Sequence, residues 1–394
     1  MDRALADIRV LDATQVMAGP FCAMVLCDMG ADVIKVEPPS GDSSRRMAGA
    51  TGTESPSFNA VNRGKRGLVI DLKRPDGPDL FRRLARGVDV VIENYRPGVM
   101  RRLGLDYGRL HVDNPRLVYA SISGYGQTGP AAAKGGFDLV AQGESGLMSI
   151  TGVPGGPPLK VGVPITDLGA GLFAVAGILA ALHYRERTGC GQLVDTSLLE
   201  AGVALSVWEA TEYFAGRGVP EPLGSAHRMS APYQAIRCAD GHITLGAAND
   251  RLFERMCDLL GHPEWITDPR FATDTARLAN RDVLIEAIEA ITSLQPCAHW
   301  LRSLQARDIP CGPINRYDRV FRDPQVRDRG MVVETDHPVL GRIQTLGSPI
   351  KMSATPTLPG RPAPLLGEHT AEILREAGLR PDEIAALRTS RTIA

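Results

Sequence analysis

One acidic residue, Asp167, stands where the extended segment VGVPIT gives way to an apolar stretch with helical periodicity. Large apolar residues follow it at three- and four-residue steps, the spacing of one buried helix face: Leu168, Leu172, Val175, Leu179 and Leu182. Aspartate is a favoured N-cap, whose side chain accepts a backbone N–H at the positive end of the helix dipole. Asp167 is therefore either a helix cap or a carboxylate that does chemistry at a helix start.

Cations and amides gather in the loops that follow predicted strands. They are Lys73 and Arg74 after one strand, Asn94, Tyr95, Arg96 and Arg102 after the next, and Lys134 after the glycine-rich run SGYGQTGP. Each alone is an ordinary surface group. Together, at one edge of a parallel sheet, they indicate a ligand with several phosphates and an adenine ring, because Lys and Arg suit phosphate while Asn and Tyr suit base and ribose.

The elements that must position these residues alternate between strand and helix. Strands are predicted at 8–14, 31–37, 66–71, 88–93 and 117–122, with helices at 21–29 and 76–86 between them. This alternation predicts a Rossmann-like, doubly wound α/β domain, which binds ligands at the carboxyl ends of its strands. The dinucleotide fingerprint GxGxxG is missing from the first strand-to-helix turn, where Met17, Ala18, Gly19 and Pro20 stand, so a nicotinamide dehydrogenase is not indicated.

The helix after Asp167 is rich in small residues, including Gly169, Gly171 and Gly177, so neighbouring backbone should approach it closely. A second long helix is predicted from about Ser197 to Phe214, and the pattern then changes. We expect a large domain over 1–215, a linker over 216–231, a small α+β domain over 232–324, and a return to the large domain over 325–394. The small domain should contain a hairpin at 233–247 and helices at 250–260, 280–293 and 297–307, and the last segment antiparallel strands and one final helix.

Composition narrows the class of protein. With 394 residues, 43% hydrophobic content and a formal charge of -1, the chain suggests a soluble globular protein that binds neither nucleic acid nor membrane. The N-terminal residues show no targeting pattern, and the longest apolar run, Leu168–Leu182, looks too short and glycine-rich to span a bilayer. Seven cysteines without a CxxC pair indicate reduced thiols in the cytoplasm, and eight histidines without HExxH spacing give no indication of a metal.

Several motifs, taken in order along the chain, resemble the class III CoA-transferases, the family of formyl-CoA transferase and carnitine CoA-transferase. The motifs are LDATQVMAGPFCAMVLCDMGADVIKVEPPSGD, NRGKRGLVIDLKRPDG, VIENYRPGVMRRLGLDY, SGYGQTGP, VGVPITDLGAG, LAALHYRERTGCGQ, DPRF, IPCGPI and PLLGEHT. The resemblance runs from about Leu5 to Thr370 and implies an interlinked homodimer, with a large domain built from both chain ends. It also implies that CoA and acyl-CoA are substrates and that no cofactor is held permanently.

The resemblance also implies roles for individual residues. Asp167 falls on the family's catalytic aspartate, and Asp138 on an acidic residue close to it. Arg102 would lie near the phosphates of CoA and Lys134 near the reacting end. Further CoA contacts would come from Met17, Ala18, Ile70, Asp71, Leu72, Lys73, Asn94, Tyr95 and Arg96.

An aspartate suits this chemistry because CoA transfer must retain the activation of the thioester. Attack by Asp167 on an acyl-CoA gives a mixed anhydride, which the CoA thiolate can open to an aspartyl-CoA thioester. Such intermediates are hydrolysed easily, so water must be excluded. The helix dipole should favour Asp167 as a carboxylate, by about 0.3–1 kcal/mol. Some relatives cover the site with a run of four glycines, which this sequence does not contain.

Two stretches, LGSAHRMSAPYQAIRCADGHITLGAAND and DPQVRDRGMVVETDHPVLGRI, resemble the branch that uses succinyl-CoA and dicarboxylic acids such as glutarate, hydroxymethylglutarate or itaconate. Met17 stands where formyl-CoA transferase has a glutamine, which favours a less polar acyl pocket. A second carboxylate on the acceptor needs a cation. Arg45, Arg46 and Arg228 are the candidates, and each can equally be a structural arginine.

Two other functions stay open. A 2-methylacyl-CoA racemase shares the fold but pairs an aspartate with a histidine as opposed bases, and Phe137 stands where that histidine would be. A non-catalytic CoA-binding protein would use Asp167 only as a helix cap. Replacing Asp167 should leave the fold and activity of such a binding protein intact, whereas epimerisation of a 2-methylacyl-CoA without an acceptor would indicate the racemase.

Overall fold

The computed structural model describes residues 3–47, 49, 54–357 and 361–394. The chain forms two compact units. The first comprises Met1–Leu147, Lys160–Arg217 and Pro324–Ala394, and the second comprises Met148–Leu159 and Gly218–Asp323. The domain boundaries proposed from the sequence, at 215, 231 and 324, stay a prediction.

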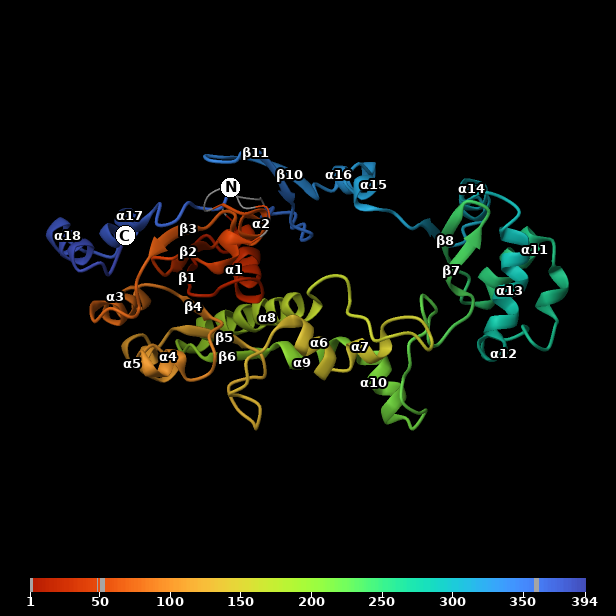
Figure 1. Cartoon of the computed structure of the whole chain (residues 1–394), viewed down its shortest axis with the longest axis horizontal. Coiled ribbons are helices and arrows are strands. Elements are labelled where there is room, and N and C mark those ends of the chain that lie inside the picture. The colour runs from red at the N-terminus through yellow and green to blue at the C-terminus, as the bar shows by residue number, and fades with distance from the viewer. Residues whose placement is uncertain (1–2, 48, 50–53, 358–360) are drawn as a thin grey trace. The chain divides into compact units, whose positions relative to one another are not determined.

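A six-stranded parallel sheet forms the centre of the first unit, with strand order β3-β2-β1-β4-β5-β6 (Figure 1). Its strands are β1 Arg9–Asp12, β2 Asp32–Glu37, β3 Arg66–Val69, β4 Val90–Glu93, β5 Val118–Ser123 and β6 Leu193–Ser197. The order of strands reverses between β1 and β4. In doubly wound sheets ligands bind at this switch, outside the carboxyl ends of the strands.

The α/β class and five of these strands agree with the sequence prediction, but the sixth strand was missed. The sequence pattern before Ser197 predicts a turn that leads directly into a helix, whereas Leu193–Ser197 pairs in parallel with β5. This edge strand is short, and its exposed Leu193 and polar Asp195 and Thr196 give no buried apolar run.

Helices cover both faces of the sheet, because successive strand residues point to opposite sides. In β1, Val10 packs into a core with α1 (Ala18–Asp28), α8 (Ile165–Thr188) and α9 (Leu198–Leu205). Its neighbour Leu11 packs into the opposite core with α3 (Asp76–Ala85), α17 (Thr370–Glu376) and α18 (Pro381–Thr389). The C-terminal helices thus lie beside the N-terminal part of the sheet (Figure 1).

The helix that carries Asp167 begins earlier than predicted. Helix α8 starts at Ile165 with Pro164 at the N-cap, so Asp167 lies in the first turn and is not the cap. The predicted buried face was also partly wrong. Leu172 is 51% exposed, whereas the buried side is built from Ala170, Ala174, Ile178 and Ala181.

The predicted close approach to α8 is confirmed. A Cβ on Gly171 would lie 2.8 Å from the Ala18 carbonyl oxygen in α1, and one on Gly177 would lie 2.6 Å from Val194 Cγ1. By length and composition α8 is also the one described helix that could cross a membrane. Half of its most apolar window is buried, and a core helix of a soluble protein passes the same test.

The other helices of the first unit are shorter. They are α2 Pro56–Asn62, α4 Val99–Arg102, α5 Tyr107–Asp113, α6 Asp138–Glu144, α7 Leu147–Ile150, which ends in the second unit, α10 Val207–Phe214, α16 Pro324–Asp328 and the 3-10 helix η1 Ser43–Arg46. The single helix predicted over 197–214 is therefore two helices, broken at Ser206. The predicted final helix is also two, α17 and α18, and Gly378 between them has a φ of 76°.

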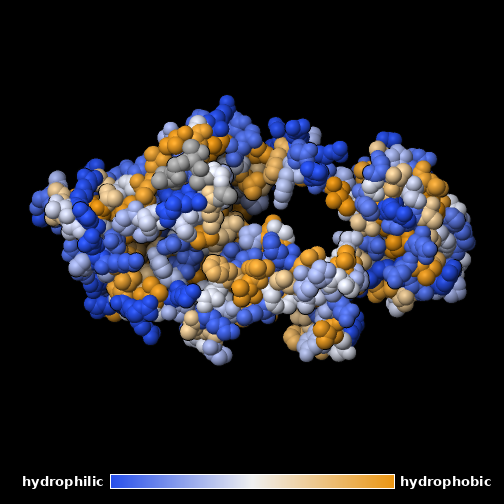
Figure 2. Space-filling model, viewed as in Figure 1, coloured by the Kyte–Doolittle hydropathy of each residue, from blue (hydrophilic) through white to orange (hydrophobic). Residues whose placement is uncertain are grey.

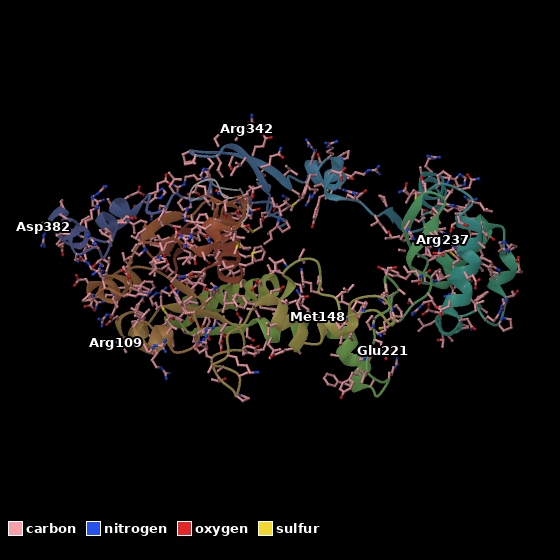
Figure 3. The ribbon with its side chains drawn as sticks, in the orientation of Figure 1. Arg109, Met148, Glu221, Arg237, Arg342 and Asp382 are labelled. Carbon is pink, nitrogen blue, oxygen red and sulfur yellow. The ribbon has the colours of Figure 1, made fainter. Side chains whose placement is uncertain are left out.

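Strands β10 (Val332–His337) and β11 (Gly341–Leu346) form the predicted antiparallel hairpin. Arg342 of β11, labelled in Figure 3, pairs with Glu334 of β10 at 2.6 Å.

The second unit combines an antiparallel sheet, in the order β7-β8-β9, with a layer of helices. Its elements are β7 Tyr233–Cys238, β8 Gly241–Gly246, β9 Cys311–Pro313, α11 Asp250–Leu260, α12 Asp274–Ala279, α13 Arg281–Thr292, α14 Cys297–Gln305, α15 Tyr317–Val320 and the 3-10 helix η2 Pro263–Ile266. The hairpin and three of these helices were predicted. Strand β9 was missed because its three residues, Cys-Gly-Pro, have no strand pattern.

Candidate active site

Asp167 lies on a cavity of about 310 Å³ at the switch point of the sheet. Its lining includes Met17 and Ala18 after β1, Asn94, Tyr95 and Arg96 after β4, Ser123 at the end of β5, and Lys134 to Phe137. We call it the Asp167 cavity. Residues predicted separately from three strand ends are thus brought to the carboxylate.

A second cavity of about 480 Å³, which we call the Lys73 cavity, lies beside the first. Gln15 and Tyr95 line both cavities. The Lys73 cavity is also lined by Ile70, Asp71, Leu72 and Lys73 after β3, by Arg46, and by Arg102 of α4. An elongated ligand with a polyanionic end in the Lys73 cavity could therefore reach Asp167 with its other end.

The start of α8 is held by Asp138, from helix α6. Asp138 Oδ1 accepts hydrogen bonds from the Thr166 backbone N–H at 3.0 Å and from Thr166 Oγ1 at 2.7 Å. Its other oxygen accepts from Gln142 Nε2 at 2.7 Å. The fully buried Gln142 also accepts from Val161 N at 2.8 Å. Asp138 therefore does for the first turn of α8 what a capping side chain does, and Asp167 is left free to face the cavity.

Burial and the nearby charge of Asp138 raise the pKa of Asp167 to about 7. This result corrects the expectation that its position at a helix start would favour the ionised form. A helix dipole is worth at most about 2 kcal/mol at a partly buried site, whereas burial beside a second carboxylate acts in the opposite direction and outweighs it. At neutral pH a large fraction of Asp167 is protonated.

The turn between β1 and α1 is shaped by side chains around it. Asn94 Oδ1 accepts from Gln15 N, and Asn94 Nδ2 donates to the Gln15 carbonyl oxygen, both at 2.8 Å. The next residue, Val16, has a φ of 69°, which is an outlier for a β-branched residue. The predicted ligand residue Asn94 thus has its amide occupied by the turn.

The remaining predicted cations fall in different places. Arg45 is buried, with its guanidinium paired to Glu37 at 2.7 Å and Glu54 at 2.9 Å, so it does not reach either cavity. Arg46 lines the Lys73 cavity and not the Asp167 cavity. Arg228 belongs to the second unit and donates to the Glu221 carbonyl oxygen at 2.7 Å.

Two cations do line the Asp167 cavity. Lys134 Nζ lies 3.9 Å from Glu144 Oε1 and 5.6 Å from the centre of the Tyr125 ring. The Arg96 guanidinium lies over Gly135, where a Cβ would stand 2.7 Å from Nη2. No group of three His, Cys, Asp or Glu side chains that could hold a metal occurs within the described ranges.

The family model described as CoA-transferase family III matches residues 5–370. The chain belongs to this family. It is 42% identical over 380 residues to the succinate–glutarate CoA-transferase of Agrobacterium fabrum, which covers 94% of this chain and 95% of that one. It is 40% identical over 383 residues to the mouse succinyl-CoA:glutarate CoA-transferase, covering 97% and 88%. A crystal structure of a CAIB/BAIF family protein from Brucella suis superposes with a TM-score of 0.85 at 38% identity, covering 96% of this chain and all of that one.

Membership makes the protein a CoA-transferase, an enzyme whose substrates are CoA thioesters. Sequence reasoning missed several residues that shape its site, above all Gln142, Val16 with its positive φ, and Asp42, whose carboxylate accepts the Val16 N–H at 3.3 and 3.2 Å. Gln142 lies in a stretch with an ordinary helical pattern. A positive φ cannot be predicted from a sequence unless glycine occupies the position. Asp42 does precede two serines, a local signal for a cap, which could have been noticed.

Proposed function

We propose that this CoA-transferase moves CoA from succinyl-CoA to a second dicarboxylic acid such as glutarate, with Asp167 as the nucleophile. The observation that carries the proposal is a half-buried carboxylate on a cavity that adjoins a second, cation-lined cavity. The names of the Agrobacterium and mouse relatives support the acids involved.

In the first half of the proposed reaction, a carboxylate oxygen of Asp167 attacks the thioester carbonyl of succinyl-CoA. CoA thiolate leaves, and a mixed anhydride of Asp167 and succinate remains. The thiolate then attacks the Asp167 carbonyl carbon and expels succinate, which leaves an aspartyl-CoA thioester. The accepting carboxylate repeats these steps in reverse, so no oxidant and no net proton is required.

The two cavities suggest how CoA lies. Its phosphates would be held in the Lys73 cavity by Lys73, Arg102 and Arg46, and its adenine beside Ile70, Asp71 and Leu72. The uncharged pantetheine arm would pass Tyr95 and Gln15, which line both cavities, and bring the sulfur to Asp167. Met17, Ala18 and Asn94 would then border the thiol end.

Because the pantetheine arm is neutral, cations in the Asp167 cavity would face carboxylates. We therefore propose Arg96 and Lys134 as the groups that hold the acid substrates, in place of Arg45, Arg46 and Arg228. With Arg96→Met, kcat/KM for glutarate should fall about tenfold relative to that for butyrate, which has no second carboxylate. The matched variant Arg102→Met should lower kcat/KM for both acceptors by the same factor, because Arg102 is proposed to bind CoA. If Arg96→Met lowers kcat/KM equally for glutarate and butyrate, Arg96 binds CoA as well.

We also propose that the protein is a homodimer in the cytoplasm, as the family resemblance implies. Apolar side chains are exposed along three helices of the first unit: Leu172 and Phe173 of α8, Val203 and Leu205 of α9, and Trp208 and Phe214 of α10. Figure 2 shows hydrophobic surface over α10. A second copy of the chain would cover them, and light scattering should give the mass of two chains. The variant Trp208→Asp should weaken that association.

One experiment tests the function. The protein is incubated with succinyl-CoA and a panel of dicarboxylates, and acyl-CoA products are followed by mass spectrometry. Asp167→Ala should abolish transfer, and hydroxylamine added during turnover should convert Asp167 to a hydroxamate. Transfer that survives in the variant contradicts the mechanism. Epimerisation of a 2-methylacyl-CoA without an acceptor would favour the racemase, although Phe137 at the predicted position of the second base cannot accept a proton.

A further inference from the structure

The turn Gln15–Ala18 is shared by the two cavities and contains a strained residue. All four residues line the Asp167 cavity, and Gln15 also lines the Lys73 cavity. Val16 has a φ of 69°, in the left-handed region that glycine tolerates and β-branched residues avoid. Such conformations persist only where surrounding groups impose them, and they cluster at functional sites.

The groups that impose this conformation come from outside the turn. Asp42 accepts the Val16 N–H on both carboxylate oxygens, at 3.3 and 3.2 Å. Lys35 of β2 donates to Asp42 Oδ2 at 3.0 Å and to the Thr14 carbonyl oxygen, one peptide before the turn. The side chains of Lys35 and Asp42 are both 0% exposed, so neither is available to a ligand.

Asp42 is itself fixed. Its Oδ1 accepts from Ser44 N at 2.9 Å and from Ser44 Oγ at 2.8 Å, and its own N–H donates to Glu37 Oε2 at 2.9 Å. Although burial raises the pKa of this carboxyl, Lys35 and the Ser44 hydrogen bonds lower it further, so its pKa lies below the ordinary value. The carboxylate therefore keeps its charge and its orientation toward Val16.

We propose that Asp42, supported by Lys35, is a positioning residue that holds Val16 in the left-handed conformation and thereby fixes the turn between the two cavities. Without this restraint Val16 relaxes to a negative φ, which moves Met17 and Ala18 away from their places on the Asp167 cavity. The inference rests on the proposed function, because its main assay is CoA transfer.

A double-mutant cycle tests it with Asp42→Asn and Val16→Gly. Asn keeps the shape of Asp42 but accepts the Val16 N–H on one oxygen only and removes the carboxylate that is hydrogen-bonded to Lys35, which keeps the nearby charges of Asp12 and Glu37. Glycine needs no restraint at a φ of 69°. We expect Asp42→Asn to lower kcat/KM roughly tenfold or more when residue 16 is valine, and roughly threefold or less when it is glycine. Equal losses in both backgrounds would mean that Asp42 matters only as a buried charge, and would overturn the proposal.

Asp28→Asn is the matched control. Asp28 is a buried partner of Arg63 at 2.6 Å, so its replacement also leaves a buried cation, but it makes no contact with the turn. Its effect on kcat/KM should be the same in the wild-type background and in the Val16→Gly background.

A second measurement does not depend on Asp42→Asn being folded or on catalysis. Alanine has a Cβ and is also strained at a positive φ, although less than valine, whereas glycine is not, so Val16→Gly should melt at a higher temperature than Val16→Ala. The reverse order would show that the conformation is not strained. A wild-type enzyme without transferase activity would instead refute the proposed function, and the order of these melting temperatures would still decide whether Val16 is strained.

Discussion

Replacing Asp167, the proposed nucleophile, should make the protein more stable above neutral pH. The carboxyl of Asp167 has a pKa of about 7 because burial and Asp138 disfavour its charge, against an ordinary value of 3.8. One pKa unit corresponds to 1.36 kcal/mol, so ionising this group in the folded protein costs roughly 4 kcal/mol more than in the unfolded chain. Because the Asp167 side chain is partly exposed to solvent, we expect its ionisation to lower the free energy of unfolding by about 2–4 kcal/mol.

The sign and the pH window follow from the direction of this shift. Below pH 3.8 the carboxyl is protonated in both states and does not affect stability. Between pH 3.8 and about 7 the unfolded chain ionises while the folded chain stays protonated, so the folded state loses stability as the pH rises. Above pH 7 the loss is complete. Asp167→Asn has no such loss.

The assay is thermal unfolding of both proteins between about pH 5 and pH 8.5, without ligand. At pH 8 the Asn variant should melt roughly 2–5 °C higher than the wild type, and the difference should shrink as the pH falls. The matched control is Asp76→Asn, which also removes an acidic residue from the first turn of a helix, α3, but at an exposed position. It should lose stability slightly, by about 0.3–1 kcal/mol. A gain from Asp167→Asn that is absent at pH 8, or that does not depend on pH, would refute the reasoning.

Three further predictions concern the same site. Asp138→Asn removes the charge that helps to raise the pKa of Asp167, so the acidic limb of the kcat/KM profile, expected near pH 7, should move to lower pH. Gly171→Ala should lower stability by about 1–3 kcal/mol, because the new Cβ would stand 2.8 Å from the Ala18 carbonyl oxygen. Gly162→Ala, with nothing within 4 Å, is its control in thermal unfolding. Arg102→Met should weaken CoA binding about tenfold in titration calorimetry and reduce its salt dependence, whereas the exposed Arg109→Met, labelled in Figure 3, should not.

The large-scale fold could be predicted because the buried strands carry their signal locally. Short apolar runs such as the LVI of RGLVID are typical of parallel strands covered on both faces. Loops after such strands meet at one edge, which is why Lys73, Asn94 and Lys134 could be grouped from strand pattern alone. The edge strand β6 lacked that signal, since Leu193 is exposed and polar residues follow it.

The electrostatics of the site could not be predicted, because they depend on residues far apart in sequence. The pKa of Asp167 is raised first by burial and then by Asp138, and Asp138 is oriented by Gln142 and Thr166. Local pattern suggested instead that Asp167 caps its own helix. The surroundings of Arg45, one of the arginines proposed for the acceptor, could not be predicted for a similar reason. A sequence cannot show that Glu37 and Glu54 already occupy the guanidinium of Arg45.

The raised pKa of Asp167 is itself an argument for its role as nucleophile. A carboxylate that is hard to ionise is more basic, and hence more nucleophilic, than an ordinary one. Its charge is lost when the carboxylate is converted to an anhydride or a thioester, so the burial and the repulsion from Asp138 that disfavour the free carboxylate no longer oppose the group once the intermediate has formed. A residue whose only role was to cap α8 would gain nothing from such a neighbour. Asp138 already accepts the Thr166 N–H of that helix, so capping does not account for a second carboxylate beside it, whereas the proposed chemistry at Asp167 does.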